Sequence, residues 1–354
     1  MKKYIALLLP FFPLLLQSQI EPYLKILNDQ DVIWAAEMNL YFSIEPEYTH
    51  SDSSFEKMNS ATTLKLLRSH SNSGNLLLCE KLLELCKTGK QDAFVPYHEN
   101  TRYDAAARRE GLRSIDSITV IDPVTTMEYN RVVYNDPDAR AIIGVWVKQL
   151  LFYHEKSAEF DIYTVAFAPD FAVFTNSEPA VYLYSRTPYW FRMPPWSPKS
   201  NARQPDLQDP NITWACRMTT LKNMPSLEKV QPFKDFKPPI MQQLLDRFQR
   251  DPAYQVTETQ NGAPIPFENR EGLIVQTDSV LTFDPETYEE KPQVLRTELT
   301  GYQIKHLCLS QDWFWDEKKQ QLIIRLHAFA PMLERYDSNG DFFYWRALFW
   351  RGKR

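Results

Sequence analysis

The sequence predicts an α+β fold made of two tandem repeats, each a small antiparallel sheet with a long hairpin and helices packed on it. Two observations support this prediction. A block of the chain recurs at a constant offset of 162 residues, and each copy contains short runs rich in β-branched residues beside turn signals. Helical patterns precede the blocks, which is typical of an α+β arrangement. With 354 residues, the chain is long enough for two domains of ordinary size.

The internal repeat is visible as two pairs of matching motifs in one register. DSITVIDPVT (116–125) matches DSVLTFDPET (278–287), and FYHEKSAEFDIYTVAFAP (152–169) matches FWDEKKQQLIIRLHAFAP (314–331). Chance does not hold one register through two separated motifs. A weaker match upstream, LLELCKTGKQDAFV (82–95) with LLDRFQRDPAYQV (244–256), predicts the end of a helix followed by an extended segment in each unit.

The last part of each copy predicts a long hairpin. Residues 160–165 and 321–326 are rich in branched and aromatic side chains, which favours strands. The charged run 316–319 predicts the turn before the second of these strands. Asn339-Gly340 is a favoured turn dipeptide, and it predicts a further turn before an aromatic strand at 342–350.

Earlier segments predict turns and one more helix. Asp122-Pro123 and its copy Asp284-Pro285 are turn dipeptides. Residues 32–40 have a helical pattern. Each unit is therefore expected to run from a helix through a strand with an Asp-Pro turn to the long hairpin.

Domain organisation follows from the repeat and from shifts in composition. Lys2 and Lys3, followed by a short apolar run at 5–16, are typical of a secretory signal peptide, because the run is too short to span a membrane. Residues 185–239 are rich in proline, which disfavours helices and central strands. The predicted ranges are a signal peptide at 1–19, a first unit at 20–184, a proline-rich connector at 185–239 and a second unit at 240–354.

Composition and motifs argue against several classes of function. The formal net charge of −5 disfavours nucleic acid as a partner, because phosphate binding needs a basic surface. The sequence has no glycine-rich phosphate loop, no GxSxG and no HExxH, and its histidines show no metal-ligand spacing. The repeated carboxylates are interpreted as turn residues. We therefore predict no catalytic residue, no metal and no cofactor.

The four cysteines leave two alternatives open. An exported chain permits disulfides, whereas buried free thiols explain the same residues equally well. Cys79 and Cys86 lie in a predicted helix, where their spacing places them about 10 Å apart along the axis, too far for a mutual bond. The redox state of Cys79, Cys86, Cys216 and Cys308 stays open at this point.

An aromatic and charged corner is present in both copies, as FYHEK and FWDEK. Such a corner is either core packing or an exposed anchor for a neighbouring subunit, where Trp and Tyr concentrate binding energy. The candidate interface residues are Phe152, Tyr153, Glu155, Lys156, Trp313, Phe314, Trp315, Asp316, Lys318, Phe349 and Trp350.

These segments resemble the GldN/PorN family of gliding motility and type IX secretion. QDWFWDEKKQQLIIRLHAFAP (311–331), preceded by IKHL (304–307) and followed by ALFW (347–350), is similar to the family's signature segment. VIDPVTTMEY (120–129) and TFDPETYEE (282–290) resemble its Asp-Pro-Thr-Gly segment, and DVIWAAEMNLYFSI (31–44) resembles its opening helix. The chain departs from the family pattern in carrying two copies of the signature segment.

The resemblance implies a non-enzymatic ring component of the periplasm, located at the inner face of the outer membrane. It also implies a homo-oligomer that binds an outer-membrane lipoprotein and contacts the membrane only through that partner. Two other hypotheses stay open. One is an exported module that binds polysaccharide or protein through aromatic surfaces, and the other is a hydrolase with an unrecognised carboxylate pair.

Overall fold

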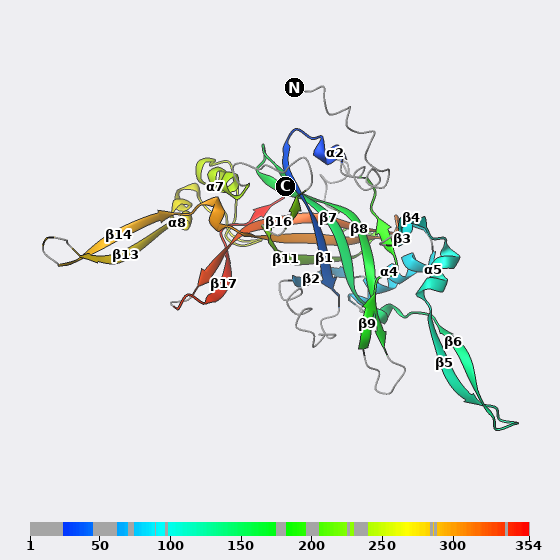
Figure 1. Ribbon diagram of the computed structural model, residues 1–354. Coiled ribbons are helices and arrows are strands. Elements are labelled where there is room, and N and C mark those ends of the chain that lie inside the picture. The colour runs from blue at the N-terminus through cyan, green and yellow to red at the C-terminus, as the bar shows by residue number, and fades with distance from the viewer. Residues whose placement is uncertain are drawn as a thin grey trace, which may run out of the picture.

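The computed structural model consists mostly of antiparallel β-structure, in two large sheets that form a curled half-barrel (Figure 1). It describes residues 24–44, 62–69, 74–88, 90–95, 98–174, 182–195, 205–224, 227–229, 240–283, 286, 289–336 and 339–353. The predicted signal peptide lies outside these ranges. The predicted α+β fold with two helix-packed repeats is wrong, because the two sheets pack on each other and strands supply most of the core surface.

The first large sheet is centred on three long antiparallel strands, β1 (Val32–Ser43), β7 (Ile142–His154) and β8 (Glu159–Phe174). Its order is β12-β1-β7-β8-β10-β3-β4, and β9 pairs with the end of β8. The shorter strands are β3 (Ala93–Val95), β4 (His98–Arg102), β9 (Tyr182–Arg186), β10 (Trp190–Arg192) and β12 (Glu228–Lys229).

Strand β1 replaces the helix that was predicted at 32–40. Most of its side chains are buried, and it pairs with β7 along its whole length. Ala35, Ala36 and Met38 are good or acceptable helix formers, but helix propensity is a weak preference that tertiary pairing overrides. The helix prediction failed because the partner strand β7 lies more than a hundred residues away in the chain.

The second large sheet repeats the arrangement with β11 (Ile212–Asn223), β15 (His306–Asp316) and β16 (Gln321–Tyr336). Its order is β17-β16-β15-β11-β2, and β18 pairs with β16. The other strands are β2 (Thr62–Ser69), β17 (Phe342–Ala347) and β18 (Arg351–Gly352). Strand β11 is central, so the expectation that 185–239 avoids central strands is wrong; the prolines flank β11 and none falls inside it.

Each half of the chain donates an edge strand to the sheet of the other half. Strand β2 follows β1 in the chain but pairs with β11, and β12 follows β11 but pairs with β1. The helices α4 (Leu76–Thr88) and α7 (Ile240–Arg250) also reach across, each to the long hairpin turn of the opposite half. The two halves are therefore interleaved. The predicted domain boundaries stay a prediction.

Two two-stranded arms project in opposite directions from the sheets (Figure 1). The first arm is β5 (Ser114–Ile121) with β6 (Glu128–Asn135), and the second is β13 (Val275–Phe283) with β14 (Glu290–Glu298). Helices α4 and α5 (Ala105–Leu112) lie near the root of the first arm, and α7 and α8 (Glu271–Ile274) near that of the second. Within the described ranges, the remaining helices are α2 (Leu24–Leu27) and the 3-10 turns η4 (Ala139–Ala141), η6 (Phe267–Asn269) and η7 (Gly301–Gln303).

Local predictions within the repeat are confirmed. Helices α4 and α7 end inside the two matched upstream segments, and the predicted strands at 160–165 and 321–326 lie in β8 and β16. Turns occur at 122–125 and 317–320, and Gly340 has the positive φ of 85° that its turn before β17 requires. Asp284-Pro285 lies outside the described residues.

The offset of 162 residues recurs in the fine geometry. Both long hairpins change register immediately before a glutamine, Gln149 in β7 and Gln311 in β15. The turn residues Ala158 and Gln320 both have a φ of 51°. The amides of Gln149 and Gln311, both 0% exposed, donate to each other's Oε1 at 3.0 and 2.9 Å. A pseudo-two-fold axis therefore passes between these two glutamines.

One hydrophobic core joins the two sheets. Phe42 of the first sheet contacts Trp313 of the second with ring centroids 4.7 Å apart, and Phe160 contacts Phe329 at 5.2 Å, both edge to face. The four cysteines are buried and free, so the free-thiol alternative describes this structure. Large aromatic side chains thus hold the two halves together without a disulfide bond between them.

Candidate interaction surfaces

The predicted corner residues divide by burial. The charged residues Glu155, Lys156 and Lys318 are exposed. The aromatic residue Trp350 is half-buried. The buried members are Phe152, Tyr153, Trp313, Phe314, Trp315, Asp316 and Phe349. Apart from the half-buried Trp350, the aromatic part of the corner therefore packs in the core, the first of the two alternatives. The fully exposed members are the charged Glu155, Lys156 and Lys318.

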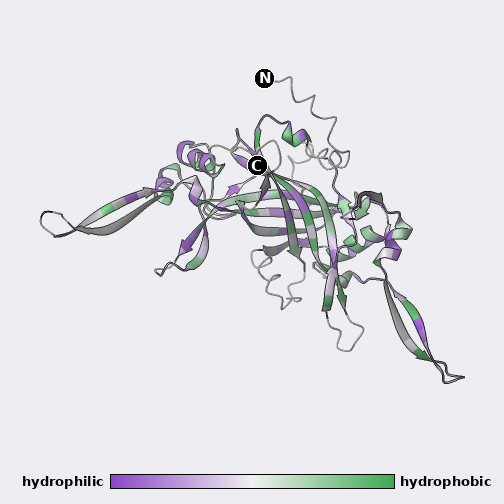
Figure 2. Cartoon of the chain, viewed as in Figure 1, coloured by the Kyte–Doolittle hydropathy of each residue, from purple (hydrophilic) through white to green (hydrophobic). Residues whose placement is uncertain are grey.

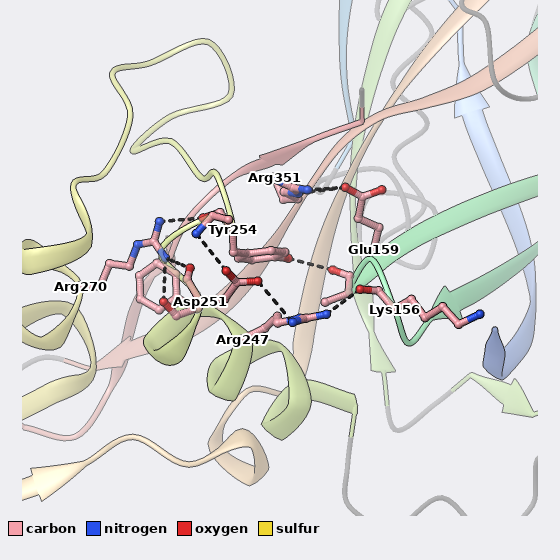
Figure 3. Close-up of polar contacts among 10 residues, drawn as sticks. Lys156, Glu159, Arg247, Asp251, Tyr254, Arg270 and Arg351 are labelled. Carbon is pink, nitrogen blue, oxygen red and sulfur yellow. Dashed lines mark hydrogen bonds and ion pairs between the residues drawn. The ribbon is translucent and has the colours of Figure 1, made fainter.

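The exposed turn of the first hairpin is bonded to α7 of the other half (Figure 3). Arg247 donates from Nη2 to the carbonyl of Lys156 at 2.6 Å, and its Nη1 lies 3.3 Å from Asp251 on the next turn of chain. The Lys156 side chain points away from these contacts in Figure 3. The backbone of this corner is a junction between halves, whereas its lysine faces solvent.

A second set of contacts secures the same turn. The hydroxyl of Tyr254 donates to the carbonyl of Ala158 at 2.8 Å, and Arg351 donates from Nε to Glu159 at 3.1 Å (Figure 3). The Arg351 guanidinium also lies over the Tyr254 ring, 4.5 Å from its centroid. Burial raises the pKa of Tyr254 far above its ordinary value, so the hydroxyl stays a donor.

A buried arginine organises the loop that carries Tyr254. Arg270 is 3% exposed and donates to three backbone carbonyls, those of Phe248 (3.0 Å), Asp251 (2.9 Å) and Tyr254 (2.6 Å). Its guanidinium also lies over the Phe248 ring. Burial lowers the pKa of Arg270, but arginine remains protonated in proteins. The charge therefore acts as a fixed donor for the loop.

Arg108 is the counterpart of Arg270 in the first half, 162 residues earlier. It is also buried, and it donates from Nε to the carbonyl of Tyr103 at 2.8 Å. The prediction from sequence missed both arginines. The repeated tetrapeptide Arg-Glu-Gly-Leu at 109–112 and 270–273 marks this region, but its offset of 161 aligns Arg270 with the exposed Arg109, so it does not by itself identify Arg108.

The second sheet carries a charged cluster on its outer face. Arg217 donates from Nε and Nη2 to the two carboxylate oxygens of Asp312 at 2.6 and 2.9 Å, and His327 Nδ1 lies 3.2 Å from the same carboxylate. Burial opposes ionisation of Asp312, but the hydrogen bonds from His327 and Arg217 outweigh it and hold its pKa below the ordinary value. The counterparts of Asp312 and His327 in the first half are apolar, Leu150 and Val165.

The chemistry available at these sites is limited. Burial raises the pKa of the Cys86 and Cys308 thiols to about 12, and it raises that of Cys216 well above the ordinary value, so these thiols are not nucleophiles at neutral pH. Within the described ranges, no group of three or more His, Cys, Asp or Glu side chains is placed to hold a metal ion. The same ranges contain no helix long and apolar enough to cross a membrane.

The first arm holds apolar side chains away from the core. The exposed ones are Ile121, Val124, Met127, Tyr129, Val132 and Tyr134. Tyr129 and Val132 lie on opposite faces of the ribbon, because side chains alternate along a strand. Figure 2 shows hydrophobic residues reaching the far part of this arm. Exposed apolar surface of this kind commonly marks a binding site for another molecule.

The tip of the first arm is a well-defined turn. Asp122 Oδ1 accepts from the backbone N–H groups of Val124 (2.8 Å) and Thr125 (3.1 Å), and the Asp122 N–H donates to the carbonyl of Met127 (2.9 Å). These backbone bonds hold the pKa of Asp122 below its ordinary value. The turn presents Val124, 89% exposed, and Met127, 71% exposed.

The second arm differs at the equivalent positions. Glu286 and Glu289 stand 162 residues after Val124 and Met127, and both are exposed, as is Glu290. Equivalent positions therefore carry apolar side chains in the first half and carboxylates in the second.

A third exposed surface is the aromatic hairpin, defined as the end of β16 and strand β17 (residues 334–347). Its exposed side chains are Tyr336, Phe342, Phe343 and Tyr344. Trp345 packs on His306, with ring centroids 4.0 Å apart, and fixes the base of the hairpin. Among the described strands, β17 pairs with β16 alone, which leaves its other edge free.

The prediction from sequence placed the candidate interface at the corner and missed the arm tip and the aromatic hairpin. The signals were the apolar residues around the Asp122-Pro123 turn and the aromatic run Phe342-Phe343-Tyr344-Trp345. No protein-family model matches this chain, and no curated protein sequence matches it.

Proposed function

We propose that this chain is a structural subunit that acts by binding other protein subunits, and that it is not an enzyme. The observation that carries the proposal is the first arm, which extends from the sheets and exposes apolar side chains such as Val124 and Met127 at a rigid tip. Keeping such side chains in water is unfavourable, at about 25 cal/mol per Å² of apolar surface, so a partner that covers them gains binding energy.

The resemblance to the GldN/PorN family supports a specific setting for this role. In that setting the chain is a periplasmic component of the type IX secretion and gliding motility machinery, bound to an outer-membrane lipoprotein. Because the corner aromatics are buried, we assign the proposed contacts to the arms and the aromatic hairpin, which are exposed. The charged corner residues Glu155, Lys156 and Lys318 remain proposed rim contacts.

The test is the native mass and composition of the complex isolated gently from cell envelopes through a C-terminal tag. A large particle that contains an outer-membrane lipoprotein is the expected result. A lone particle near the chain mass of 41.7 kDa would contradict the proposal. In that case, binding to polysaccharide through the exposed Tyr336 and Tyr344 becomes the next measurement.

A further inference from the structure

The two sides of the aromatic hairpin differ in charge. Across its strands, Leu333 pairs with Arg346, and Arg335 pairs with Tyr344. Leu333 belongs to the hydrophobic core, and side chains alternate along a strand. Arg335, Tyr344 and Arg346 therefore share the core-facing side of the ribbon, beyond the point where the core ends. Arg346 is exposed and Arg335 is half-buried. We call these three residues the arginine face.

The carboxylates of the hairpin do not neutralise the arginine face. Glu334 lies on the opposite side of the ribbon, where it accepts from the Tyr336 hydroxyl and lies 3.7 Å from His306. Asp341 lies in the turn, before β17 begins. Among the described residues, neither arginine of the face has a carboxylate partner or a hydrogen bond from its guanidinium. Two like charges therefore lie diagonally across one ribbon, at a spacing of about 7 to 8 Å.

The first half shows what satisfies this position when the chain itself covers it. Strand β9 pairs with β8 in the register in which β17 pairs with β16, including the register shift, so Arg186 corresponds to Arg346 and Val173 to Arg335. Arg186 donates from Nη2 to the carbonyl of Leu112, the last residue of α5. A helix C-terminus carries partial negative charge. The first half thus has one arginine here and covers it with an acceptor, whereas the second half has two, which no described group covers.

Strand β17 also has a free edge. Among the described strands it pairs with β16 alone, and Figure 1 shows it at the margin of the second sheet. A free edge presents N–H and C=O groups that another strand can satisfy. Side chains of an added strand alternate between the two sides. One set lies beside the arginine face, and the other lies beside Phe342 and Trp345, whose ring centroids are 5.0 Å apart on the outer side.

We propose that the free edge of β17 binds an extended segment of a partner protein in which carboxylates alternate with apolar side chains. The carboxylates lie on the arginine face, because guanidinium groups bind carboxylates in a bidentate geometry. The apolar side chains cover Phe342 and Trp345. This inference rests on the proposed function and names the chemistry of one partner contact.

Two features of the hairpin select this occupant. The free edge selects a polypeptide over a lipid or a sugar, because only a polypeptide backbone repeats N–H and C=O groups at the spacing of a strand. The arginine face selects an acidic segment, since a neutral or basic one leaves both guanidinium groups without a counter-charge. Charge complementarity of this kind also fixes the register of the added strand.

The test measures binding of synthetic peptides of about eight residues, the length of an ordinary strand, to the full exported chain. The probe alternates glutamate and valine. One comparison peptide has lysine in place of each glutamate. Two others carry N-methyl groups on the backbone nitrogens of all the glutamates or of all the valines. A strand at a sheet margin uses one of its two edges, so we expect only one of the N-methylated peptides to lose binding.

The matching protein variant is R335Q/R346Q, which removes the charge of the arginine face. Its control is K25Q/R250Q, which removes two exposed positive charges elsewhere on the chain. We expect the Kd of the probe to rise about fivefold to tenfold for R335Q/R346Q and to stay unchanged for the control. Unchanged near-ultraviolet circular dichroism confirms that both variants are folded.

Three results would overturn the proposal. They are no measurable binding of the probe to the wild type, equal binding of the lysine peptide, and an unchanged Kd for R335Q/R346Q. If both N-methylated peptides bind like the probe and soluble polygalacturonate displaces it, the face binds an acidic polysaccharide and strand addition is wrong.

Failure of this proposal is distinguishable from failure of the proposed function. A large native particle that contains a lipoprotein, together with no peptide binding, would leave the proposed function intact. Peptide binding by a chain that is isolated alone would contradict the proposed function only.

Discussion

The two halves of the molecule agree in the interior and differ where they face outward. Both have three long antiparallel strands, a register change before a central glutamine and a buried arginine at the root of an arm. They differ at the arm tips, at the contacts of the long hairpin turns and on the outer sheet faces. Duplication has thus kept the strand pairing that makes the core and changed the side chains that meet solvent or partners.

The buried arginines give the sharpest contrast. Replacing Arg270 with methionine leaves the carbonyls of Phe248 and Tyr254 without this donor, whereas that of Asp251 keeps the N–H of Tyr254. We expect a loss of about 3 to 4 kcal/mol in the free energy of unfolding. Arg108→Met removes the hydrogen bond to the carbonyl of Tyr103 and should cost about 1 to 2 kcal/mol. Urea unfolding of both variants provides the comparison. Equal losses would show that the two sites are energetically equivalent despite their different bonds.

The two long turns are held with different strength. Arg351→Met leaves Glu159 largely buried without its partner, and we expect a loss of about 2 to 3 kcal/mol. Lys81→Met breaks a contact to Glu317 of the other turn, which is more exposed, so about 0.5 kcal/mol is expected. The measurement is again urea unfolding, at low and high salt. A larger effect for Lys81 than for Arg351 would reverse this ranking.

Gln149 and Gln311 lie where the two halves meet, and their contribution to stability as a pair can be measured. A single Gln149→Leu change leaves the amide of Gln311 buried without its partner and should cost about 2 kcal/mol. Replacing both glutamines with leucine removes the unpaired group as well. The double variant should therefore be more stable than either single variant, as measured in a double-mutant cycle. Simple addition of the two single losses would show that the amides do not act as a pair.

The sequence allowed the local elements to be predicted and missed what depends on distant partners. The strands around Ile162 and Ile324 and the Asn339-Gly340 turn follow from residue type and spacing. The exchange of β2 and β12 between halves leaves no local pattern, so the interleaving was not foreseen. The motif Trp-Ala-x-x-Met, at Trp34 and again at Trp214, was the missed sign that β1 and β11 correspond.

The aromatic residues of the predicted interface lie in the core, and this too could not be predicted from local sequence. Repetition of the FYHEK and FWDEK corner indicates a constraint shared by both halves. Because Trp313 and Trp315 are buried, that constraint is packing in the core. A binding surface on a duplicated chain is better sought where the copies differ, as Val124 and Glu286 do. Sequence alone does not distinguish these cases, because an aromatic side chain serves core and interface equally well.

The smallest predicted effect concerns the outer face of the second sheet. The folded-state pKa of Asp312 lies below its ordinary value of about 3.9. The carboxylate therefore stabilises the fold above that pH, and this contribution is lost as the pH falls through the folded pKa. The first half has no equivalent charge, since Leu150 stands at the corresponding position.

Stability of the wild type should thus fall more steeply below about pH 4 than that of Asp312→Asn, which has no carboxylate to protonate there. Unfolding curves between pH 3 and pH 7, compared as slopes rather than absolute values, provide the measurement. The asparagine variant is less stable at neutral pH, because Arg217 loses its charged partner, so only the slope is informative. Parallel slopes would mean that Asp312 is protonated equally in the folded and unfolded chain. The charged cluster would then act in packing alone, as the apolar residues of the first sheet do.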